Sequence, residues 1–187
     1  VDVSLEESTS HEQYKEALVT CVEESDRILT LLNSIMDISE AETGTMRLKL
    51  ETVNLRKLID EIVELYQVVA ENKNILVSID GAEDICITAD INRMRQVVGN
   101  LLDNAMKYSG PGGRVMISLR TAANHVVISF RDTGIGIPAE EIPEIWKRLY
   151  RGDKSRSQPG LGLGLSLVKA IVGAHRGDVE VHSKSGA

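Results

Sequence analysis

The apolar residues of the first quarter of the chain follow a helical period. Residues 11–41 contain neither Gly nor Pro, and apolar residues recur there at spacings of three, four or their sums: Leu18, Val22, Leu29, Leu32 and Met36. This pattern predicts one long amphipathic helix. Three further apolar positions widen the stripe and favour a helical bundle over a two-stranded zipper: Ile28, Leu31 and Ile35. A lone helix cannot bury such a stripe, so it packs on another chain, on sequence absent here, or on its own domain.

The pattern changes near Gly44, which is suited to end this helix, and the alternation that follows predicts a strand at Leu48, Leu50 and Val53. We therefore place a domain boundary there, between residues 1–44 and 45–187. Further helices are expected after Asn54 and Asp90, which are good N-caps. The expected helices cover residues 55–69, 91–108, 139–148 and 165–175, and the expected strands cover residues 75–80, 85–89, 115–121, 126–131 and 179–182.

Helices and strands interleave, but the hairpin of the last pair of long strands is antiparallel. The pattern therefore favours an α+β fold, a two-layer α/β sandwich preceded by the long helix, over a doubly wound sheet.

Composition and charge argue against several classes of function. Among 187 residues, 21 Lys and Arg stand against 28 Asp and Glu, so the net charge is −7. That balance opposes a broad nucleic-acid or anionic-membrane surface, and no apolar run approaches the roughly 18 residues that span a bilayer. Cys21 and Cys86 show no metal-ligand spacing and no disulfide framework. We expect a cytoplasmic fragment that contacts neither nucleic acid nor membrane, in a parent protein with or without a membrane anchor.

Two glycine-rich loops, residues 132–138 (DTGIGIP) and 160–166 (GLGLGLS), carry candidate chemistry. Neither has the GxGxxG or the GxxxxGK[ST] spacing, so neither a Rossmann nor a Walker-A site is expected. Glycine permits positive φ and lets backbone N–H groups approach an anion. The second loop directly precedes a predicted helix, whose N-terminus also attracts phosphate. Each loop alone is equally compatible with a flexible turn.

A third element lies on the helix predicted over residues 91–108. Asn100, Asn104 and Lys107 are spaced i, i+4 and i+7, which puts two amides and an ammonium on one face. Amide oxygens suit Mg²⁺, the ammonium suits phosphate, and Tyr108 offers a ring on which a base can stack. The alternative is a solvated polar face, although such faces are usually richer in Glu and Lys.

In this order, the elements resemble the ATP-binding domain of sensor histidine kinases, within the wider gyrase, Hsp90, histidine kinase and MutL superfamily. The segments that carry the resemblance are residues 96–109 (N box), 132–138 (G1 box), 145–153 (F box) and 160–166 (G2 box). The resemblance covers about residues 48–186. Residues 36–44 resemble the end of the second helix of the dimerisation and phosphoacceptor hairpin.

The resemblance implies ATP and Mg²⁺ as ligands. Asp132 would accept a hydrogen bond from the adenine amino group, Asn104 with Asn100 nearby would hold Mg²⁺, Lys107 would bind phosphate, and Tyr108 would cover the base. Further nucleotide-binding positions implied by the boxes are Gly134, Gly136, Arg151, Gly160, Leu161, Gly162, Leu163 and Gly164. Residues 151–159 would form a mobile lid. Trp146 and Leu149 stand where the F box usually has Phe.

The resemblance also places the catalytic histidine elsewhere. Gyrase-like relatives have a Glu at the position of Asn100 to activate water, whereas an amide is a poor base, so rapid hydrolysis is not expected. The family's phosphoacceptor His lies in an H-E-x-x-T-P-like box, and here only His11 precedes a Glu, without the rest of the box. His125 is expected to begin a strand, and His175 to end a helix where cation–dipole attraction explains it. No catalytic residue is therefore assigned.

We expect the intact protein to be a homodimeric protein histidine kinase in two-component signal transduction, which passes the phosphoryl group to an Asp of a response regulator receiver domain. This fragment is expected to bind ATP without autophosphorylating. Two alternatives remain: an anti-sigma-type serine kinase, and an inactive interaction module that keeps the fold.

Overall fold

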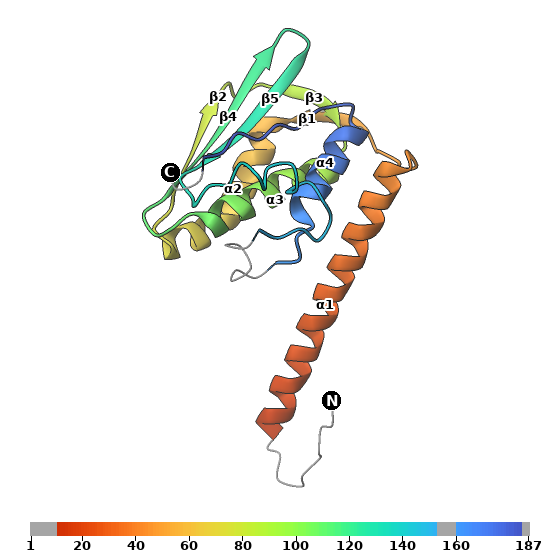
Figure 1. The fold of residues 1–187 in the computed structure, drawn as a ribbon, viewed down its shortest axis with the longest axis vertical. Helices are drawn as coiled ribbons and strands as arrows, with labels where there is room; N and C mark the ends of the chain where they lie inside the picture. The colour runs from red at the N-terminus through yellow and green to blue at the C-terminus, as the bar shows by residue number, and fades with distance from the viewer. Residues whose placement is uncertain (1–10, 153–159, 185–187) are drawn as a thin grey trace.

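The structure, a computed structural model, describes residues 11–152 and 160–184. Figure 1 shows a long helix that leads into a body of helices and strands. The elements are α1 (His11–Glu42), β1 (Glu51–Asn54), α2 (Leu55–Asn72), β2 (Leu76–Gly81), β3 (Cys86–Ala89), α3 (Ile91–Tyr108), β4 (Arg114–Ala122), β5 (His125–Asp132) and α4 (Gly164–Ala174).

The described strands form two small sheets. β1 pairs with β3 antiparallel, while β4 lies between β2, which is parallel to it, and β5, which is antiparallel. The parallel pair requires a crossover, which the chain makes through β3 and α3. This mixed arrangement confirms the predicted α+β class.

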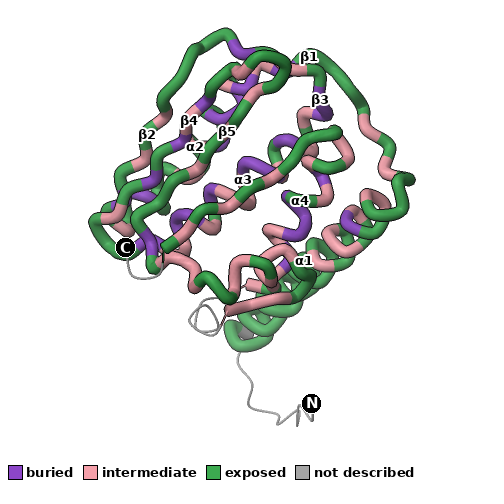
Figure 2. Tube along the Cα trace, turned by 45° about the horizontal axis from the view of Figure 1, so that its top comes forward, coloured by how far each residue is buried: buried purple, intermediate pink, exposed green. Residues whose placement is uncertain are grey.

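The main core lies between the larger sheet and the two helices α2 and α3. Alternate residues of β4 point inward, and Val115, Ile117 and Leu119 are at most 2% exposed. Leu58 and Ile59 of α2 meet them from the other layer, as do residues of α3. Figure 2 shows the buried positions concentrated between the two layers, so the sandwich is confirmed.

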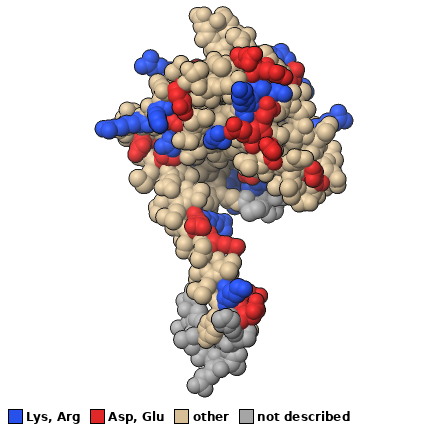
Figure 3. Space-filling model, turned by 180° about the vertical axis from the view of Figure 1, so that it is seen from behind, with Lys and Arg blue, Asp and Glu red and all other residues tan. Residues whose placement is uncertain are grey.

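A second apolar cluster joins α1 to the body. Ile38 of α1 is 1% exposed and packs with Val97 of α3 and with Leu163, Leu167 and neighbouring residues at α4. The N-terminal part of α1 extends away from the body, where Figure 3 shows acidic and basic residues interspersed rather than segregated. Its apolar stripe is exposed at Leu18, Val22, Leu29, Leu32 and Met36. Within the described residues, α1 thus packs on its own domain through the C-terminal part that contains Leu31, Ile35 and Ile38.

Local signals for helix ends and turns are confirmed. Asn54 Oδ1 accepts the Lys57 N–H at 3.0 Å and caps α2. Gly44 has a φ of +68° just after α1, a conformation that glycine adopts without a side-chain clash. Among the described residues, no helix is long and apolar enough to cross a membrane.

Three sequence predictions are wrong. The helix expected over residues 139–148 is a series of turns, because Pro143 has no N–H and interrupts the helical hydrogen bonds. The strand expected from Leu48 begins only at Glu51, because the Lys49 N–H donates to the Asp90 carboxylate instead of to a strand. Residues 179–182 form no strand ladder with any described strand, and the neighbouring Ser183 instead accepts the Ile137 N–H through its hydroxyl.

His175 ends α4 as predicted within one residue, but its role differs from the expected cation–dipole contact. Its Nε2 accepts the Asp90 N–H at 3.0 Å, and its Nδ1 lies 2.8 Å from the carbonyl oxygen of Ile171. The two ring nitrogens thus hydrogen-bond to backbone groups of two different helix ends. His175 therefore joins the C-terminus of α4 to the N-terminus of α3.

Asp90 is the most heavily hydrogen-bonded carboxylate at these helix ends. Burial alone would raise the pKa of its carboxyl group. The N–H groups of Lys49, Arg93 and Asn92, together with the Arg93 charge, outweigh that effect, so its pKa lies below the ordinary 3.8. Ionised Asp90 thus stabilises the fold above its pKa in the unfolded chain, and this contribution is lost as the pH falls through the lower pKa of the folded chain.

We predict that Asp90→Asn flattens the acid side of the stability curve. Asparagine retains a capping oxygen but cannot ionise, and it presents an amide N–H where Lys49 needs an acceptor. The free energy of unfolding at neutral pH should fall by about 1–2 kcal/mol, and the difference from the wild type should shrink between about pH 5 and pH 2. Urea titrations over this range measure both. Parallel curves for the two proteins would contradict the assignment.

Candidate functional site

The polar side chains predicted on α3 do share one face. Asn100, Asn104 and Lys107 are all half-buried, while the apolar residues of α3 pack into the two clusters. Asn100 Nδ2 donates to the carbonyl oxygen of Gln96 at 2.7 Å, which holds the side chain against its own helix. The core therefore fixes the direction in which these three side chains point.

The loop after β5 packs against the C-terminal end of α3. A Cβ on Gly134 would lie 2.6 Å from the carbonyl oxygen of Tyr108, and the Ile135 N–H donates to that same oxygen at 3.3 Å. Asp132 is exposed, and its Oδ1 accepts the Gly134 N–H at 2.8 Å, which fixes the orientation of the carboxylate. Gly136 has a φ of +68°. Only glycine at 134 permits this approach.

The second glycine loop meets the same face of α3. A Cβ on Gly160 would lie 2.5 Å from Lys107 Nζ, and one on Gly164 would lie 2.9 Å from Asn100 Oδ1 and 3.7 Å from Asn104 Nδ2. Both Gly160 and Gly162 have positive φ, of +149° and +70°. The structure thus brings Asn100, Asn104 and Lys107 together with the loop and the first turn of α4.

Among the described residues, no side chain caps the first turn of α4. Its N-cap residue, Leu163, is buried and makes no side-chain capping hydrogen bond. Ser166 donates its hydroxyl to the Leu163 carbonyl oxygen rather than accepting an N–H. A helix N-terminus with unfilled N–H groups attracts anions.

The segment expected to resemble an F box packs behind the second loop. A Cβ on Gly162 would lie 2.5 Å from the carbonyl oxygen of Tyr150, so only glycine fits there. Trp146 lies with its ring centroid 5.9 Å from Lys169 Nζ of α4. Arg151 is half-buried, and residues 153–159 of the expected lid lie outside the described residues.

The remaining predicted positions are placed as follows. Lys107 Nζ lies 5.2 Å from the ring centroid of Tyr108, so the ring and the ammonium are neighbours at the end of α3. Leu161 is 37% exposed, whereas Leu163 is buried in the second apolar cluster. Asp132 is hydrogen-bonded to Gly134, which packs on Tyr108 at the end of α3. The structure shows no direct contact between Asp132 and the second loop.

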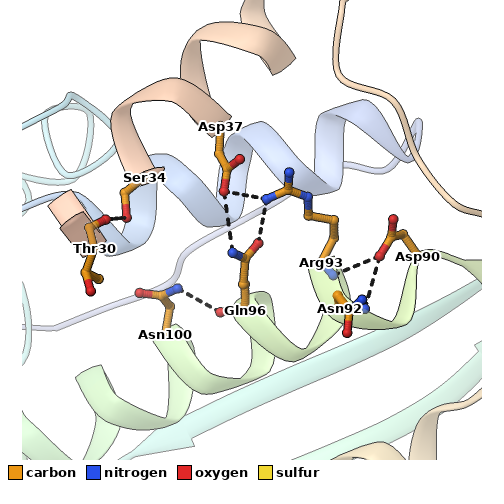
Figure 4. Close-up of polar contacts among 8 residues, drawn as sticks. All are labelled: Thr30, Ser34, Asp37, Asp90, Asn92, Arg93, Gln96 and Asn100. Carbon is orange, nitrogen blue, oxygen red and sulfur yellow. Dashed lines mark hydrogen bonds and ion pairs between the residues drawn. The ribbon is translucent and has the colours of Figure 1, made fainter. Parts of the chain in front are cut away.

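Sequence reasoning missed the other half of the α3 face. Arg93 and Gln96 precede Asn100, Asn104 and Lys107 at spacings of 3, 4, 4 and 3, so all five share one stripe of the helix, the polar stripe of α3. Figure 4 shows Arg93 and Gln96 contacting Asp37 of α1. The spacing in the sequence could have predicted the stripe. Nothing in the sequence predicts its contact with Asp37.

The fold is a sandwich in which two glycine loops pack against α3, a helix that carries two amides and a lysine on one face. This arrangement is consistent with the family that the sequence matches. Residues 89–187 match the model of the histidine kinase-, DNA gyrase B- and HSP90-like ATPases, and the chain belongs to this family. Membership of an ATPase family supports ATP as the ligand of the site.

Individual relatives narrow the comparison. Sensor protein SrrB of Staphylococcus aureus is 28% identical over 180 residues, 95% of this chain and 31% of SrrB. Sensor protein kinase WalK of Staphylococcus haemolyticus is 33% identical over 168 residues, 88% of this chain and 28% of WalK. The crystal structure of full-length ShkA in complex with AMPPNP matches with a TM-score of 0.78 at 27% identity, over 96% of this chain and 37% of ShkA. The chain thus spans less than a third of the length of SrrB and WalK.

We predict that Gly134→Ala disrupts the contact between the loop after β5 and α3. The added methyl group would overlap the Tyr108 carbonyl oxygen and Asp132 Oδ1, so the free energy of unfolding should fall by about 1–3 kcal/mol. Gly99→Ala is the matched control, because a Cβ at this helical position meets no atom within 4 Å. It should raise stability by about 0.5–1 kcal/mol. Equal stability of the two variants in chemical denaturation would refute the close approach at Gly134.

Proposed function

We propose that this chain is the Mg·ATP-binding catalytic part of a protein histidine kinase. The observation that carries the proposal is the approach of the second glycine loop to the polar stripe of α3. A Cβ would lie 2.5 Å from Lys107 Nζ at Gly160 and 2.9 Å from Asn100 Oδ1 at Gly164, so the loop and these side-chain ends approach closely. Backbone N–H groups, an ammonium and two amides therefore converge where a polyanion can be bound.

The donor set fits Mg·ATP. Amide oxygens of Asn100 and Asn104 are hard ligands that suit Mg²⁺ together with phosphate oxygens and water. Lys107 and the N–H groups of residues 160–164 would hold the phosphates, as the positive φ of Gly160 and Gly162 allows. When bound, Mg²⁺ neutralises charge on the phosphates; the chain's own residues supply orientation and hydrogen bonds.

The base would lie at the loop after β5. The orientation of the Asp132 carboxylate, held by Gly134, suits it to accept from the amino group of adenine. Guanine presents a carbonyl oxygen at that place and would be repelled by the carboxylate, so selectivity for adenine follows. The ring of Tyr108 would stack on the base, and Gly136, Arg151, Leu161 and Leu163 would complete the nucleotide-binding set.

The chemistry of the site favours transfer over hydrolysis. Phosphoryl transfer needs mainly positioning and charge neutralisation, which amides, a lysine and backbone donors can provide. Asn100 cannot act as a general base for water. The γ-phosphoryl group would therefore wait for a histidine of the intact kinase, which would form the new N–P bond as the bond to the β-phosphate oxygen breaks and ADP leaves.

The organisation proposed for the intact protein follows from this. Residues 1–44 would be part of a dimerisation hairpin and residues 45–187 the ATP-binding domain, with a homodimer as the working unit. The names of SrrB as a sensor protein and WalK as a sensor protein kinase support the assignment to a sensor kinase. The phosphoryl group would pass from the histidine to an aspartate of a response regulator receiver domain.

We predict that the chain binds ATP in a calorimetric titration, more weakly without Mg²⁺, and that it binds GTP more weakly than ATP. Asp132→Asn should weaken ATP binding by at least about tenfold, because an uncharged amide replaces a charge-assisted acceptor. Its side-chain oxygen can still accept the Gly134 N–H, so the loop should remain folded.

Asp103→Asn is the control, since Asp103 is exposed on another side of α3 next to Asn104. It should bind ATP like the wild type. A folded wild-type chain that binds no ATP, or that loses as much affinity in Asp103→Asn as in Asp132→Asn, would reject the assignment.

We also predict that the chain incubated with γ-labelled Mg·ATP gains no acid-labile label, because none of its four histidines lies in the phosphoacceptor box. Labelled phosphohistidine should form when the site is supplied with the intact kinase's phosphoacceptor helix. Stoichiometric acid-labile label on the isolated chain would contradict this reading, and acid-stable phosphoserine on a partner would favour the serine-kinase alternative.

A further inference from the structure

The C-terminal end of α1 carries one carboxylate that reaches the polar stripe of α3. Asp37 Oδ2 accepts from Arg93 Nη1 and, at 3.4 Å, from Gln96 Nε2. Arg93 Nη1 also donates to Gln96 Oε1 at 3.1 Å, so the three side chains form a closed group (Figure 4). The Asp37 and Arg93 side chains are only 13% and 21% exposed.

Partial burial distinguishes this ion pair from the others near it. The pair between Glu42 of α1 and Arg148 has side chains 59% and 37% exposed, and the pair between Glu61 of α2 and Arg95 has 55% and 41%. Solvent and salt screen such exposed pairs, whereas a half-buried pair with an additional amide partner is held more firmly. Asp37 is thus the polar contact best placed to fix α1 against α3.

The contact continues into the proposed nucleotide site along α3. The Gln96 side chain binds Asp37, and the Gln96 backbone carbonyl accepts from Asn100 Nδ2 (Figure 4). One helical turn further lies Asn104, and Gly164 of α4 lies against both asparagines. Since α3 is a continuous helix, a shift of its N-terminal half relative to α1 would also shift Asn100. The distance between Asn100 and the start of α4 would then change.

The residue after Asp37 reaches the site by a second route. Ile38 is almost fully buried in the cluster that contains Leu163, the N-cap of α4. Consecutive residues of α1 therefore connect to the two elements between which the phosphates would bind: Asp37 contacts α3, and Ile38 lies in the apolar cluster that holds the buried residues of α4.

We propose that Asp37 is a positioning residue for the nucleotide site, which acts through Arg93 and Gln96 to hold α3 at the distance from the start of α4 that binds Mg·ATP. The inference rests on the proposed function. It assigns the C-terminal end of α1 a part in nucleotide affinity, so that α1 docking and nucleotide binding are linked and each strengthens the other.

The test is a calorimetric titration of Mg·ATP into the full chain. Asp37→Asn should weaken binding about fivefold, since typical coupling between linked sites is of this order. Glu61→Gln is the matched control: it converts a carboxylate to an amide and breaks the ion pair between α2 and Arg95 of α3, on the side away from the site. Its affinity should equal that of the wild type.

A charge swap separates positioning from mere stability. Asp37→Arg alone should weaken binding further, and Asp37→Arg combined with Arg93→Asp should restore affinity to within about twofold, because the swapped pair again joins α1 to α3. In parallel, hydrogen exchange of the α4 amides of residues 164–168 without nucleotide should be faster in Asp37→Asn and normal in the swapped protein.

Unchanged affinity in Asp37→Asn, an equal loss in Glu61→Gln, or no recovery in the swapped protein would overturn the proposal while leaving the nucleotide site intact. If the wild-type chain binds no ATP, the proposed function fails instead. In that case the hydrogen-exchange rates of α4 still test the positioning role of Asp37. Rates in Asp37→Asn equal to those of the wild type would overturn it.

Discussion

The burial of α3 on two sides is the constraint on which the rest of the structure depends. Met94, Val98 and Leu102 pack toward the larger sheet, and Val97 packs toward α4 and α1. Since helical side chains repeat every 3.6 residues, two buried sides fix the direction of the third. Within the described part of the chain, the polar stripe of α3 then faces the second glycine loop and the C-terminal end of α1. The site is thus a consequence of core packing, and its side chains need little rearrangement to meet a ligand.

The loops complete the site by close backbone approach rather than by reactive side chains. Gly134 brings the loop after β5 onto the Tyr108 carbonyl oxygen, and Gly164 brings the start of α4 onto the asparagines. A methyl group at Gly134 would overlap a backbone oxygen and separate the two elements, whereas one at Gly164 would push on the end of the Asn100 side chain. Under the proposed function such an arrangement would bind and orient a polyanion, and Asn100, as an amide, is a poor base for activating water. The arrangement therefore suits an enzyme that delivers a phosphoryl group to a nucleophile held elsewhere, such as a histidine on the hairpin of a sensor kinase.

Local pattern predicted most of the elements and the shared polar face of α3, because caps, periodicity and glycine spacing are signals within a few residues. Asp90 and the hairpin of β4 and β5 were readable in this way. Pro143 outweighed an otherwise helical pattern, since one missing N–H and one ring clash interrupt a short helix. Contacts between distant segments could not be read: Asp37 with Arg93 spans 56 residues, and Asp90 with His175 spans 85. Periodicity predicts that one face of a helix is polar, but the residues that contact this face are known only from the structure.

The most direct test of the central claim is to map backbone and side-chain amide chemical shifts of the full chain on addition of Mg²⁺ and a non-hydrolysable ATP analogue. The account predicts saturable shifts at Gly134, at Gly160–Gly164 and at the side-chain amides of Asn100 and Asn104. Little change is expected on the exposed part of α1 before Thr30. Shifts confined to that exposed helix, or none in a folded chain, would contradict a nucleotide site between α3 and the glycine loops.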